Sequence, residues 1–268
     1  MSKTIKEYIE LYISQGFTVV QARNLTAQQI LLGKIEKSKY VDNVLLKGGV
    51  VMYNITQEQR RTTSDLDLDF IRYDISSDES IRLFVDILNR KDTRYNVKIV
   101  GKIDNLKQQD YHGKRVRLVI SDNTESIKFK IDIGVHTLLG INQSRMCFSF
   151  SGDKELFLLV NPPEQIFSEK LLSLAKIGPV STRYKDIDDM YYLLTHDMLN
   201  INVLRKCLEL LTINKLNDIN DLLNAINRFT ECLENVFFEK NYYESYNSWL
   251  DEEYEVIKNT LIDFLYKV

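Results

Sequence analysis

The spacing of apolar positions divides the chain into stretches that predict different elements. In the first forty residues these positions recur at helical spacing, which predicts helices near Lys3–Ser14 and Val20–Glu36. The short apolar run Val44–Leu46 then leads into Lys-Gly-Gly, which is typical of a strand that ends in a turn. We expect a helix to begin at about Val50, directly after that turn.

The stretch from Asp65 to about Phe150 instead alternates apolar and polar residues with a period of two, as half-buried strands do. The apolar members of this alternation are Leu66, Leu68, Phe70, Val97, Ile99, Val116, Leu118, Ile120, Ile127, Phe129, Ile131 and Ile133. The segment Tyr111-His112-Gly113-Lys114 predicts a hairpin turn between two of these strands. One helix, near Asp78–Asn89, is expected to interrupt them.

Helical spacing returns after Asn161. The segment Asn161-Pro162-Pro163-Glu164 predicts a helix start, with Asn161 as N-cap, a proline at the first helical position and an acidic residue at the third. A second helix is expected after Gly178-Pro179, and further helices are expected near Asn220–Val236 and Ser248–Tyr266.

The length of the chain fits two modest domains or one core with an appended helical bundle. We predict an α/β core with N-terminal helices over residues 1–160 and a helical C-terminal domain over residues 161–268. Hydrophobic residues make up 44% of the 268 residues, which is enough to bury a substantial core. The formal net charge of −3 argues against a protein that coats nucleic acid non-specifically, so any contact with nucleic acid must use local patches.

The sequence shows no sign of a cysteine-based site, a secretory leader or a membrane span. The three cysteines are far apart and form no CxxC, so the sequence favours neither a zinc ribbon nor a disulfide framework. The chain opens with charged residues rather than with a secretory leader, and no apolar run approaches the ~20 residues that a bilayer span needs. We therefore expect a soluble, cytoplasmic protein without membrane contact.

Three aspartates, Asp65, Asp67 and Asp69, alternate with apolar residues on the first strand predicted after the Gly-Gly turn. Because side chains i and i+2 of a strand project the same way, about 6.6 Å apart, these carboxylates share one face and repel each other. One interpretation is a solvated strand that tolerates the charges. The other is a site that holds a cation between them.

Three further features favour a cation and phosphate site. Gly48 and Gly49 stand at a strand-to-helix turn, where the backbone can approach a ligand and the helix N-terminus offers N–H groups to phosphate. Asp132, on the polar face of a later strand, would complete the carboxylate set that two Mg²⁺ ions need. Basic residues that can bind triphosphate oxygens lie close in sequence: Lys47, Arg60 and Arg61.

Two better-known motifs are excluded. If Asp65 began an EF-hand loop, the sixth position would be Phe70 rather than glycine and the twelfth would be Ser76 rather than glutamate. No segment matches GxxxxGK[ST], so the chain has no Walker A loop.

The order of four short motifs resembles the AbiEii/AbiGii family of abortive-infection and toxin–antitoxin nucleotidyltransferases. The motifs are LLKGG, RTTSDLDL, EKLLSL and RYKDIDDMYYLL, and together they extend from about Val44 to Leu194. The resemblance implies a polymerase-β-like nucleotidyltransferase core with a mixed sheet, followed by the helical domain. It also implies an NTP-dependent nucleotidyltransferase activity.

The resemblance assigns roles to the acidic residues. The spacing Arg-x-Thr-x-Asp-x-Asp, counted from Arg61, gives the metal pair as Asp65 and Asp67 and leaves Asp69 as a spare. The alternative pair is Asp67 and Asp69. Asp132 would supply the third metal carboxylate.

The resemblance also implies phosphate contacts and one carboxylate in the helical half. Gly48 and Gly49 would bring backbone N–H groups to the phosphates. The residues expected to offset charge on the leaving pyrophosphate are Arg61, Lys170 and Lys47. The functional carboxylate of the last motif is Asp186 or Asp189, of which we prefer Asp186. It would order Lys170, Lys185 or Arg183, or contact the nucleotide.

The implied reaction transfers a nucleoside monophosphate from an NTP to a hydroxyl with the help of two Mg²⁺ ions. The family suggests RNA as acceptor, in particular a tRNA 3′ end, with growth arrest or phage defence as the outcome. Basic residues of the helical half are one candidate RNA surface, and Lys128 and Lys130, on the strand face of Asp132, would neutralise it, contact triphosphate or RNA, or be solvated. An antitoxin encoded nearby is the expected partner, without a tight complex.

Three other functions are left open by the residues. One is a nucleotidyltransferase that modifies a small molecule, as antibiotic-modifying enzymes do. Another is a degenerate module that binds nucleotide or RNA without turnover. The third is a helical interaction protein, which would leave the clustered aspartates unexplained.

Overall fold

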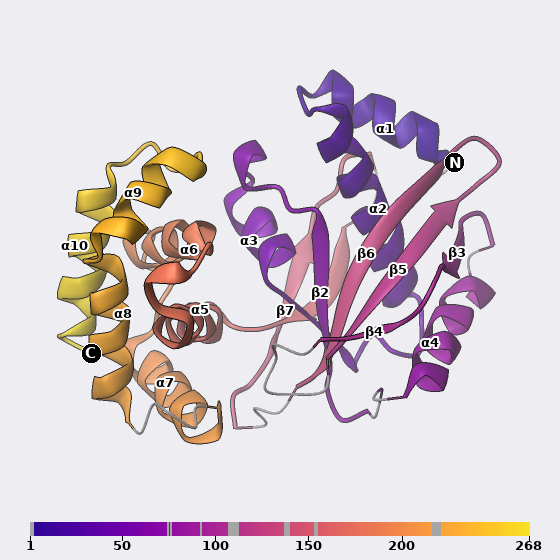
Figure 1. The fold of residues 1–268 in the computed structure, drawn as a ribbon. Coiled ribbons are helices and arrows are strands. Elements are labelled where there is room, and N and C mark those ends of the chain that lie inside the picture. The colour runs from indigo at the N-terminus through magenta and orange to yellow at the C-terminus, as the bar shows by residue number, and fades with distance from the viewer. Residues whose placement is uncertain are drawn as a thin grey trace. The chain divides into compact units, whose positions relative to one another are not determined.

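The fold is that of a computed structural model, which describes residues 3–73, 75, 77–91, 93–106, 113–136, 140–152, 155–215 and 221–268 (Figure 1). Side chains at 91 and 213–215 are not described. The chain forms two compact units. Unit 1 comprises residues 1–137 and 143–161, and unit 2 comprises residues 138–142 and 162–268.

Unit 1 is built on a mixed sheet whose described strands run in the order β3-β5-β6-β2-β1-β8-β7, with β4 paired to β5. The strands are β1 (Val44–Lys47), β2 (Asp65–Phe70), β3 (Asn96–Ile99), β4 (Asp104–Leu106), β5 (Gly113–Ser121), β6 (Ser126–Val135), β7 (Ser144–Phe148) and β8 (Leu156–Val160). Strand β2 is antiparallel to β1 and parallel to β6. The mixed α/β class predicted from the sequence is therefore confirmed.

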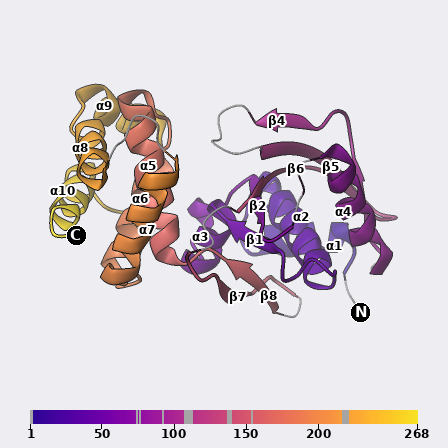
Figure 2. The same cartoon turned by 90° about the horizontal axis from the view of Figure 1, so that it is seen from below.

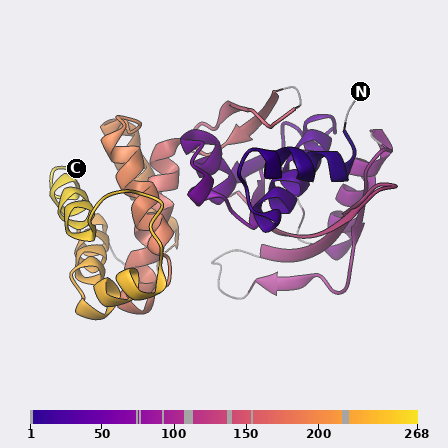
Figure 3. The ribbon, with the colours of Figure 1, turned by 90° about the horizontal axis from the view of Figure 1, so that it is seen from above.

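Helices flank this sheet. They are α1 (Ile5–Ser14), α2 (Val19–Glu36), α3 (Gly49–Thr56), the 3₁₀ turn η1 (Gln59–Arg61) and α4 (Asp78–Lys91). Figures 2 and 3 show α1 and α2 together on one side of β5 and β6. Helices α1 and α2 both begin with a capping box. The side chain of Thr4 or Thr18 accepts the backbone N–H of the residue three positions on, and the side chain of that residue accepts the backbone N–H of the threonine.

The alternation of β2 decides which side chains enter the core. Leu66, Leu68 and Phe70 are fully buried. Phe70 packs edge-to-face against Tyr40 and Phe84, with ring centroids 5.8 Å and 5.1 Å apart. Because successive side chains of a strand alternate between faces, the aspartates of β2 project from the opposite face of the sheet.

Unit 2 is helical among its described residues. Its helices are α5 (Pro163–Ile177), the 3₁₀ turn η2 (Gly178–Val180), α6 (Tyr184–Thr195), α7 (Ile201–Lys215), α8 (Leu222–Leu233), α9 (Val236–Ser245) and α10 (Tyr254–Leu265). Helix α5 contacts α6, α7 and α8, and its apolar residues Phe167, Leu171 and Leu174 are fully buried. In the part of the chain that the structure describes, no helix combines the length and the apolar character needed to cross a bilayer.

Helix α5 begins one residue later than its sequence predicts. Asn161 is not the N-cap; Pro162 occupies that position in an extended conformation, without a side-chain cap, and Pro163 is the first helical residue. The physical reason is the second proline, because a residue that precedes proline is driven out of the helical region.

The predicted hairpin turn is wrong at two of its residues. Gly113 and Lys114 are the first residues of β5 and pair with Leu106 and Asn105 of β4. Tyr111 and His112, the other half of the predicted turn, lie outside the described residues.

The C-terminal helices differ from the prediction at their ends. The helix predicted near Asn220–Val236 is α8 followed by α9, because Asn235 accepts the N–H of Phe237 and starts a new helix. Asn220 itself lies outside the described residues. The helix predicted from Ser248 begins only at Tyr254, since the Ser248 hydroxyl donates to a distant carboxylate and accepts a backbone N–H two residues on. Helix α7 and strand β8 were not predicted.

Candidate active site

The acidic face of unit 1 is organised by strand register. Lys47 of β1 stands opposite Asp67 of β2, Asp67 stands opposite Asp132 of β6, and Asp132 stands opposite Arg115 of β5. One row across four strands thus contains two adjacent carboxylates with a basic residue on either side. Two of the predicted metal carboxylates, Asp67 and Asp132, are therefore direct neighbours on adjacent parallel strands.

The Gly-Gly turn lies against this row. Gly48 has φ 68° and ψ −142°, a conformation that favours glycine, and a Cβ built on it would collide with Oδ2 of Asp67. A Cβ on Gly49 would lie 2.7 Å from Cβ of Thr63. Both glycines are required by close approach to neighbouring side chains, and Gly48 brings the start of α3 to the carboxylate of Asp67. The predicted approach of this turn to phosphate stays a prediction.

Among the carboxyls that the structure describes in unit 1, Asp67 has a strongly raised pKa. Burial raises its pKa to about 6 from 3.8, Lys47 opposes the rise, and Asp132, Asp65 and Asp69 add to it. The negative charge of this face is therefore only partly offset by the cations present.

The two neighbouring carboxylates are each held by a cation. Oδ1 of Asp65 lies 2.9 Å from Nζ of Lys130. Asp132 accepts two hydrogen bonds from Arg115, at 2.8 Å and 2.7 Å, in a bidentate arrangement. These bonds are the main reason why the pKa of Arg115 is raised. Lys130, considered in the sequence as a neighbour of Asp132, thus pairs with Asp65.

Asp69, expected to be a spare, has a partner of its own. Its Oδ2 lies 2.9 Å from Nζ of Lys47 and 4.0 Å from Nδ1 of His136, and the residue is only 3% exposed. Lys47, expected to contact phosphate, is therefore held by Asp69 on the same face as Asp67.

The two arginines of η1 differ from each other. Arg61, predicted to neutralise pyrophosphate, is only 3% exposed, so its side chain belongs to the interior of unit 1. Arg60 lies at the surface and pairs with Glu58 at 3.4 Å. Sequence spacing alone could not distinguish the two positions.

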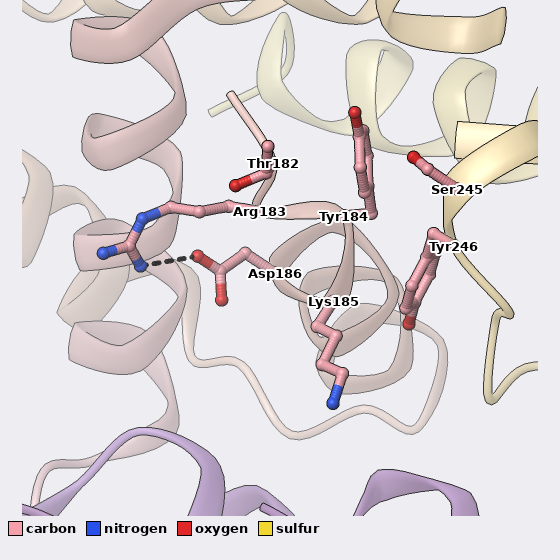
Figure 4. Close-up of a pocket in the computed structure, with 7 residues that line it drawn as sticks. All are labelled: Thr182, Arg183, Tyr184, Lys185, Asp186, Ser245 and Tyr246. Atoms are coloured by element: carbon pink, nitrogen blue, oxygen red, sulfur yellow. Dashed lines mark hydrogen bonds and ion pairs between the residues drawn. The ribbon is translucent and has the colours of Figure 1, made fainter. Parts of the chain in front are cut away.

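A second charged cluster lies within unit 2. Nζ of Lys170 on α5 lies 2.5 Å from Oδ1 of Asp186 and 2.8 Å from Oδ2 of Asp189, both on α6. Asp186 also pairs with Arg183 at 3.1 Å (Figure 4). The two carboxylates between which the sequence left a choice therefore contact the same lysine, which is almost completely buried.

The third aspartate of α6 serves the fold of unit 2. Asp188 is fully buried and accepts hydrogen bonds from the hydroxyls of Tyr242 and Tyr246, both at 2.7 Å, and from Ser248 at 2.5 Å. Burial raises its pKa, and the three hydroxyls oppose that rise. Sequence reasoning missed this residue, because its partners are more than 50 positions away.

A pocket of about 440 Å³ borders the charged cluster of unit 2. Its walls are Thr182, Arg183, Tyr184, Lys185 and Asp186 at the start of α6, with Ser245 and Tyr246 opposite (Figure 4). The rings of Tyr184 and Tyr246 are stacked, with centroids 5.8 Å apart. The pocket is thus apolar on one side and charged on the other.

The carboxylates of unit 1 fit Mg²⁺ by their chemistry. Asp65, Asp67 and Asp132 offer hard oxygen ligands, and the raised pKa of Asp67 marks a charge that a cation would relieve. Within the described ranges, no three carboxylate, histidine or cysteine side chains already gather around one point. Asp65 and Asp132 would therefore exchange Lys130 and Arg115 for the metal.

Arg115 is the residue of this face that sequence reasoning missed. It is one of several basic residues on alternating strands, and only the antiparallel register of β5 and β6 places it opposite Asp132. A hairpin register counted from the β5–β6 turn was the one signal that could have identified it.

Comparison with known proteins supports one family. The sequence profile described as "Nucleotidyl transferase AbiEii toxin, Type IV TA system" matches residues 29–254. No curated protein matches this chain. Among solved structures, the chain is similar to JHP933 from Helicobacter pylori, with a TM-score of 0.53 and 13% identity over 94% of this chain and 95% of that chain.

Two weaker structural similarities complete the comparison. Another Helicobacter pylori structure gives a TM-score of 0.49 and 14% identity over 90% of this chain and 93% of its own. Terminal uridylyl transferase 4 from Trypanosoma brucei with bound GTP gives 0.26 and 13% identity, over 82% of this chain and 64% of its own. At such identities the structural comparison supports a shared fold with JHP933 and no more.

Proposed function

Since this chain belongs to the AbiEii family of nucleotidyl transferase toxins from type IV toxin–antitoxin systems, we propose that it transfers a nucleoside monophosphate from an NTP to an RNA hydroxyl in an Mg²⁺-dependent reaction. The chain is an NTP-dependent nucleotidyltransferase with a polymerase-β-like fold, and its family implies an antitoxin partner. The metal, the RNA acceptor and the biological outcome are what we propose.

The observation that carries the proposal is the pair formed by Asp67 and Asp132. They occupy opposite positions on the parallel strands β2 and β6, and Gly48 approaches Asp67 so closely that no side chain fits between them. Carboxylates beside a glycine turn and a helix N-terminus are the groups that a metal-bound triphosphate needs.

In this proposal Asp65, Asp67 and Asp132 hold the Mg²⁺ ions. When bound, the metal supplies Lewis-acid stabilisation of the phosphate oxygens and lowers the pKa of the attacking hydroxyl. The alternative pair, Asp67 and Asp69, is disfavoured because the side chain of Asp69 is more deeply buried than those of Asp65 and Asp132.

The remaining residues of unit 1 would orient and neutralise the triphosphate. Gly48 and Gly49 let the first N–H groups of α3 approach phosphate oxygens. Lys47, held by Asp69, offsets charge that develops on the leaving pyrophosphate. Arg61 contributes its positive charge from the interior rather than by direct contact.

For the helical half, we propose that Lys170 contacts a nucleotide phosphate. Asp186 and Asp189 order its ammonium group through the two short ion pairs. Asp186 is the better candidate for direct contact with the nucleotide, since it also lines the pocket of unit 2 while Asp189 is fully buried.

The proposed acceptor is a tRNA 3′ end, and the proposed outcome is growth arrest, which would also limit phage growth. The antitoxin would act without a tight complex, and the protein would work in the cytoplasm. These statements come from the family and are proposals for this chain.

The test is nucleotidyl transfer with purified protein. Each α-³²P-labelled NTP is incubated with Mg²⁺, with and without total RNA, beside the variants Asp67→Asn and Asp132→Asn. Asp86→Asn, an exposed carboxylate on α4, is the matched control. We expect label in a discrete RNA band that both site variants reduce at least ~100-fold and the control leaves intact.

Other outcomes separate the competing functions. Label that reaches no RNA, from a protein that still binds NTP and Mg²⁺, would support a small-molecule acceptor. A protein that binds no NTP would contradict the proposal and favour the degenerate module. Retained transfer in Asp67→Asn would contradict the assignment of the metal residues.

A further inference from the structure

A strip of basic side chains leads away from the carboxylates across one face of the sheet. This basic strip comprises Arg115, Arg117, Lys130, Lys128 and Lys98. Strand register places them on one face: Arg117 pairs with Lys130, while Val119 of β5 stands between Lys128 of β6 and Lys98 of β3. This is the face that carries Asp65, Asp67 and Asp132, and it is opposite the buried face of β2.

The outer members of the basic strip carry uncompensated charge. Lys98 and Lys128 are exposed, and neither forms an ion pair with another described residue. Arg117 pairs with Asp104 at 2.7 Å but is 51% exposed. The inner members Lys130 and Arg115 pair with Asp65 and Asp132. Positive charge therefore increases with distance from the carboxylates.

The dimensions of the basic strip suit a chain of phosphates. Asp132 and Lys128 are four residues apart on β6, which is roughly 13 Å along an extended strand. Lys98 lies two strands further across the sheet, and strands are about 4.8 Å apart. A small acceptor beside Asp67 would not extend over the whole basic strip, whereas a polynucleotide would.

We propose that the basic strip binds the phosphate backbone of the RNA acceptor and leads its 3′ end to the carboxylates. This inference rests on the proposed transfer to RNA and gives that RNA a surface in unit 1, instead of the helical half. The net charge of −3 makes a local patch necessary for binding a polyanion. Lysines on a flat sheet contact phosphates without reading bases, so binding is sensitive to salt and tolerant of sequence.

The test compares two double variants with the same change in charge. Lys98→Glu with Lys128→Glu removes the outer part of the basic strip. Lys6→Glu with Lys37→Glu changes exposed lysines of the helical layer on α1 and at the end of α2. Binding of fluorescein-labelled total tRNA is followed by anisotropy across a salt series, without NTP.

We expect the strip variant to bind tRNA about tenfold more weakly, with a salt slope that is shallower by about 1 for each phosphate that the protein no longer neutralises. In transfer assays its KM for tRNA should rise while kcat and the turnover of a dinucleotide acceptor stay unchanged. The helical-layer variant should match the wild type. Lys98→Gln with Lys128→Gln should weaken binding less, and far-UV circular dichroism checks that each variant is folded.

The possible failures are distinguishable. If the wild type transfers label to RNA and the strip variant binds tRNA as well as the wild type does, the basic strip is not the RNA surface, although the proposed function stands. If both double variants bind tRNA equally weakly, the effect is one of net charge and the inference is wrong. If tRNA binds through the basic strip but accepts no label, the RNA surface stands and the proposed reaction fails.

Discussion

Asp67 is a residue of unit 1 whose charge is unfavourable in the folded protein and, in the proposed function, is used to bind metal. It is surrounded by Asp65, Asp69 and Asp132, and burial together with these neighbours raises its pKa to about 6. A carboxyl with a raised pKa binds its proton more tightly in the folded state than in the unfolded state. Its contribution to stability is therefore intact at low pH and is lost as pH rises through 6.

Asp67→Asn should accordingly stabilise the metal-free protein. At pH 8 we expect the free energy of unfolding to rise by roughly 1–3 kcal/mol, and at pH 4 to change by less than ~1 kcal/mol, because Asp67 is then largely protonated. Urea unfolding at the two pH values measures both numbers. Asp86→Asn should show no such difference, and destabilisation of Asp67→Asn at pH 8 would contradict the electrostatic interpretation.

Asp188 shares the raised pKa of Asp67 but differs from it in accepting hydrogen bonds from three hydroxyl donors. Asp188→Ala leaves the hydroxyls of Tyr242, Tyr246 and Ser248 without their acceptor, and we expect it to lower the free energy of unfolding by about 3 kcal/mol or more. Asp188→Asn keeps one acceptor oxygen and should be less destabilising. Chemical denaturation compares the two, and a decrease below ~1 kcal/mol for the alanine variant would show that the network contributes little.

At the scale of elements, the turn between β1 and α3 depends on two separate properties of glycine. Gly48 needs a positive φ, and it also needs the absence of a side chain beside Asp67. Gly178 after α5 has nearly the same backbone, φ 71° and ψ −157°, but nothing within 4 Å of a built Cβ. A comparison of substitutions at Gly48 and Gly178 therefore separates the cost of the backbone conformation from the cost of the contact with Asp67.

Gly178→Ala should lower the free energy of unfolding by about 1–3 kcal/mol, which is the cost of this glycine backbone conformation alone. Gly48→Ala should be more destabilising than this and should also abolish nucleotidyl transfer, because Asp67 must move. Thermal unfolding and the ³²P assay on both variants check the expectation. If Gly48→Ala were no more destabilising than Gly178→Ala and retained activity, the close approach of Gly48 to Asp67 would not be needed for transfer.

Helices and strands were predictable from the sequence where neighbouring residues carry the pattern. Alternation in β2 placed Asp65, Asp67 and Asp69 on one face, and helical spacing put Asp186 beside Asp189. The ends of elements were less predictable, because they depend on bonds to distant residues: Ser248 delays α10 by bonding to Asp188.

Two missed elements show different kinds of weak signal. Strand β8 is a run of five apolar residues, Leu156–Val160, and a continuous apolar run has no period that separates a strand from a helix. The start of α7 did carry a local signal, since the side chain of Asn200 accepts the N–H groups of Asn202 and Val203. An asparagine cap without a proline or an acidic first turn is easily passed over in a sequence.

At the scale of the whole molecule, charge pairing depends on strand register, of which only the β5–β6 part could be counted from a nearby turn. Arg115 meets Asp132, Lys130 meets Asp65 and Lys47 meets Asp69 only after the sheet has formed. The residue types of the candidate site were predictable from the sequence, while the role of each cation required the strand order. Whether the assigned residues perform transfer is still a prediction.

Ligand binding should be visible in global stability. If Asp65, Asp67 and Asp132 hold Mg²⁺, then Mg²⁺ at 100 times its dissociation constant should stabilise the protein by about 2.7 kcal/mol. Differential scanning fluorimetry should show a rise in Tm with MgCl₂ that EDTA reverses and that Asp67→Asn reduces. CaCl₂ and NaCl at matched ionic strength are the controls, and an equal rise with NaCl would indicate charge screening alone.

The close approach of Gly48 to Asp67 has a consequence for how this chain can change over generations. While the aspartate is needed, any side chain at position 48 is excluded by the carboxylate as well as by the backbone. Once a lineage has replaced Asp67 by a smaller residue, only the backbone restriction at position 48 is left. If Asp67 has the role that we propose for it, we expect any descendant with a side chain at position 48 to have replaced Asp67 first and to have lost nucleotidyl transfer.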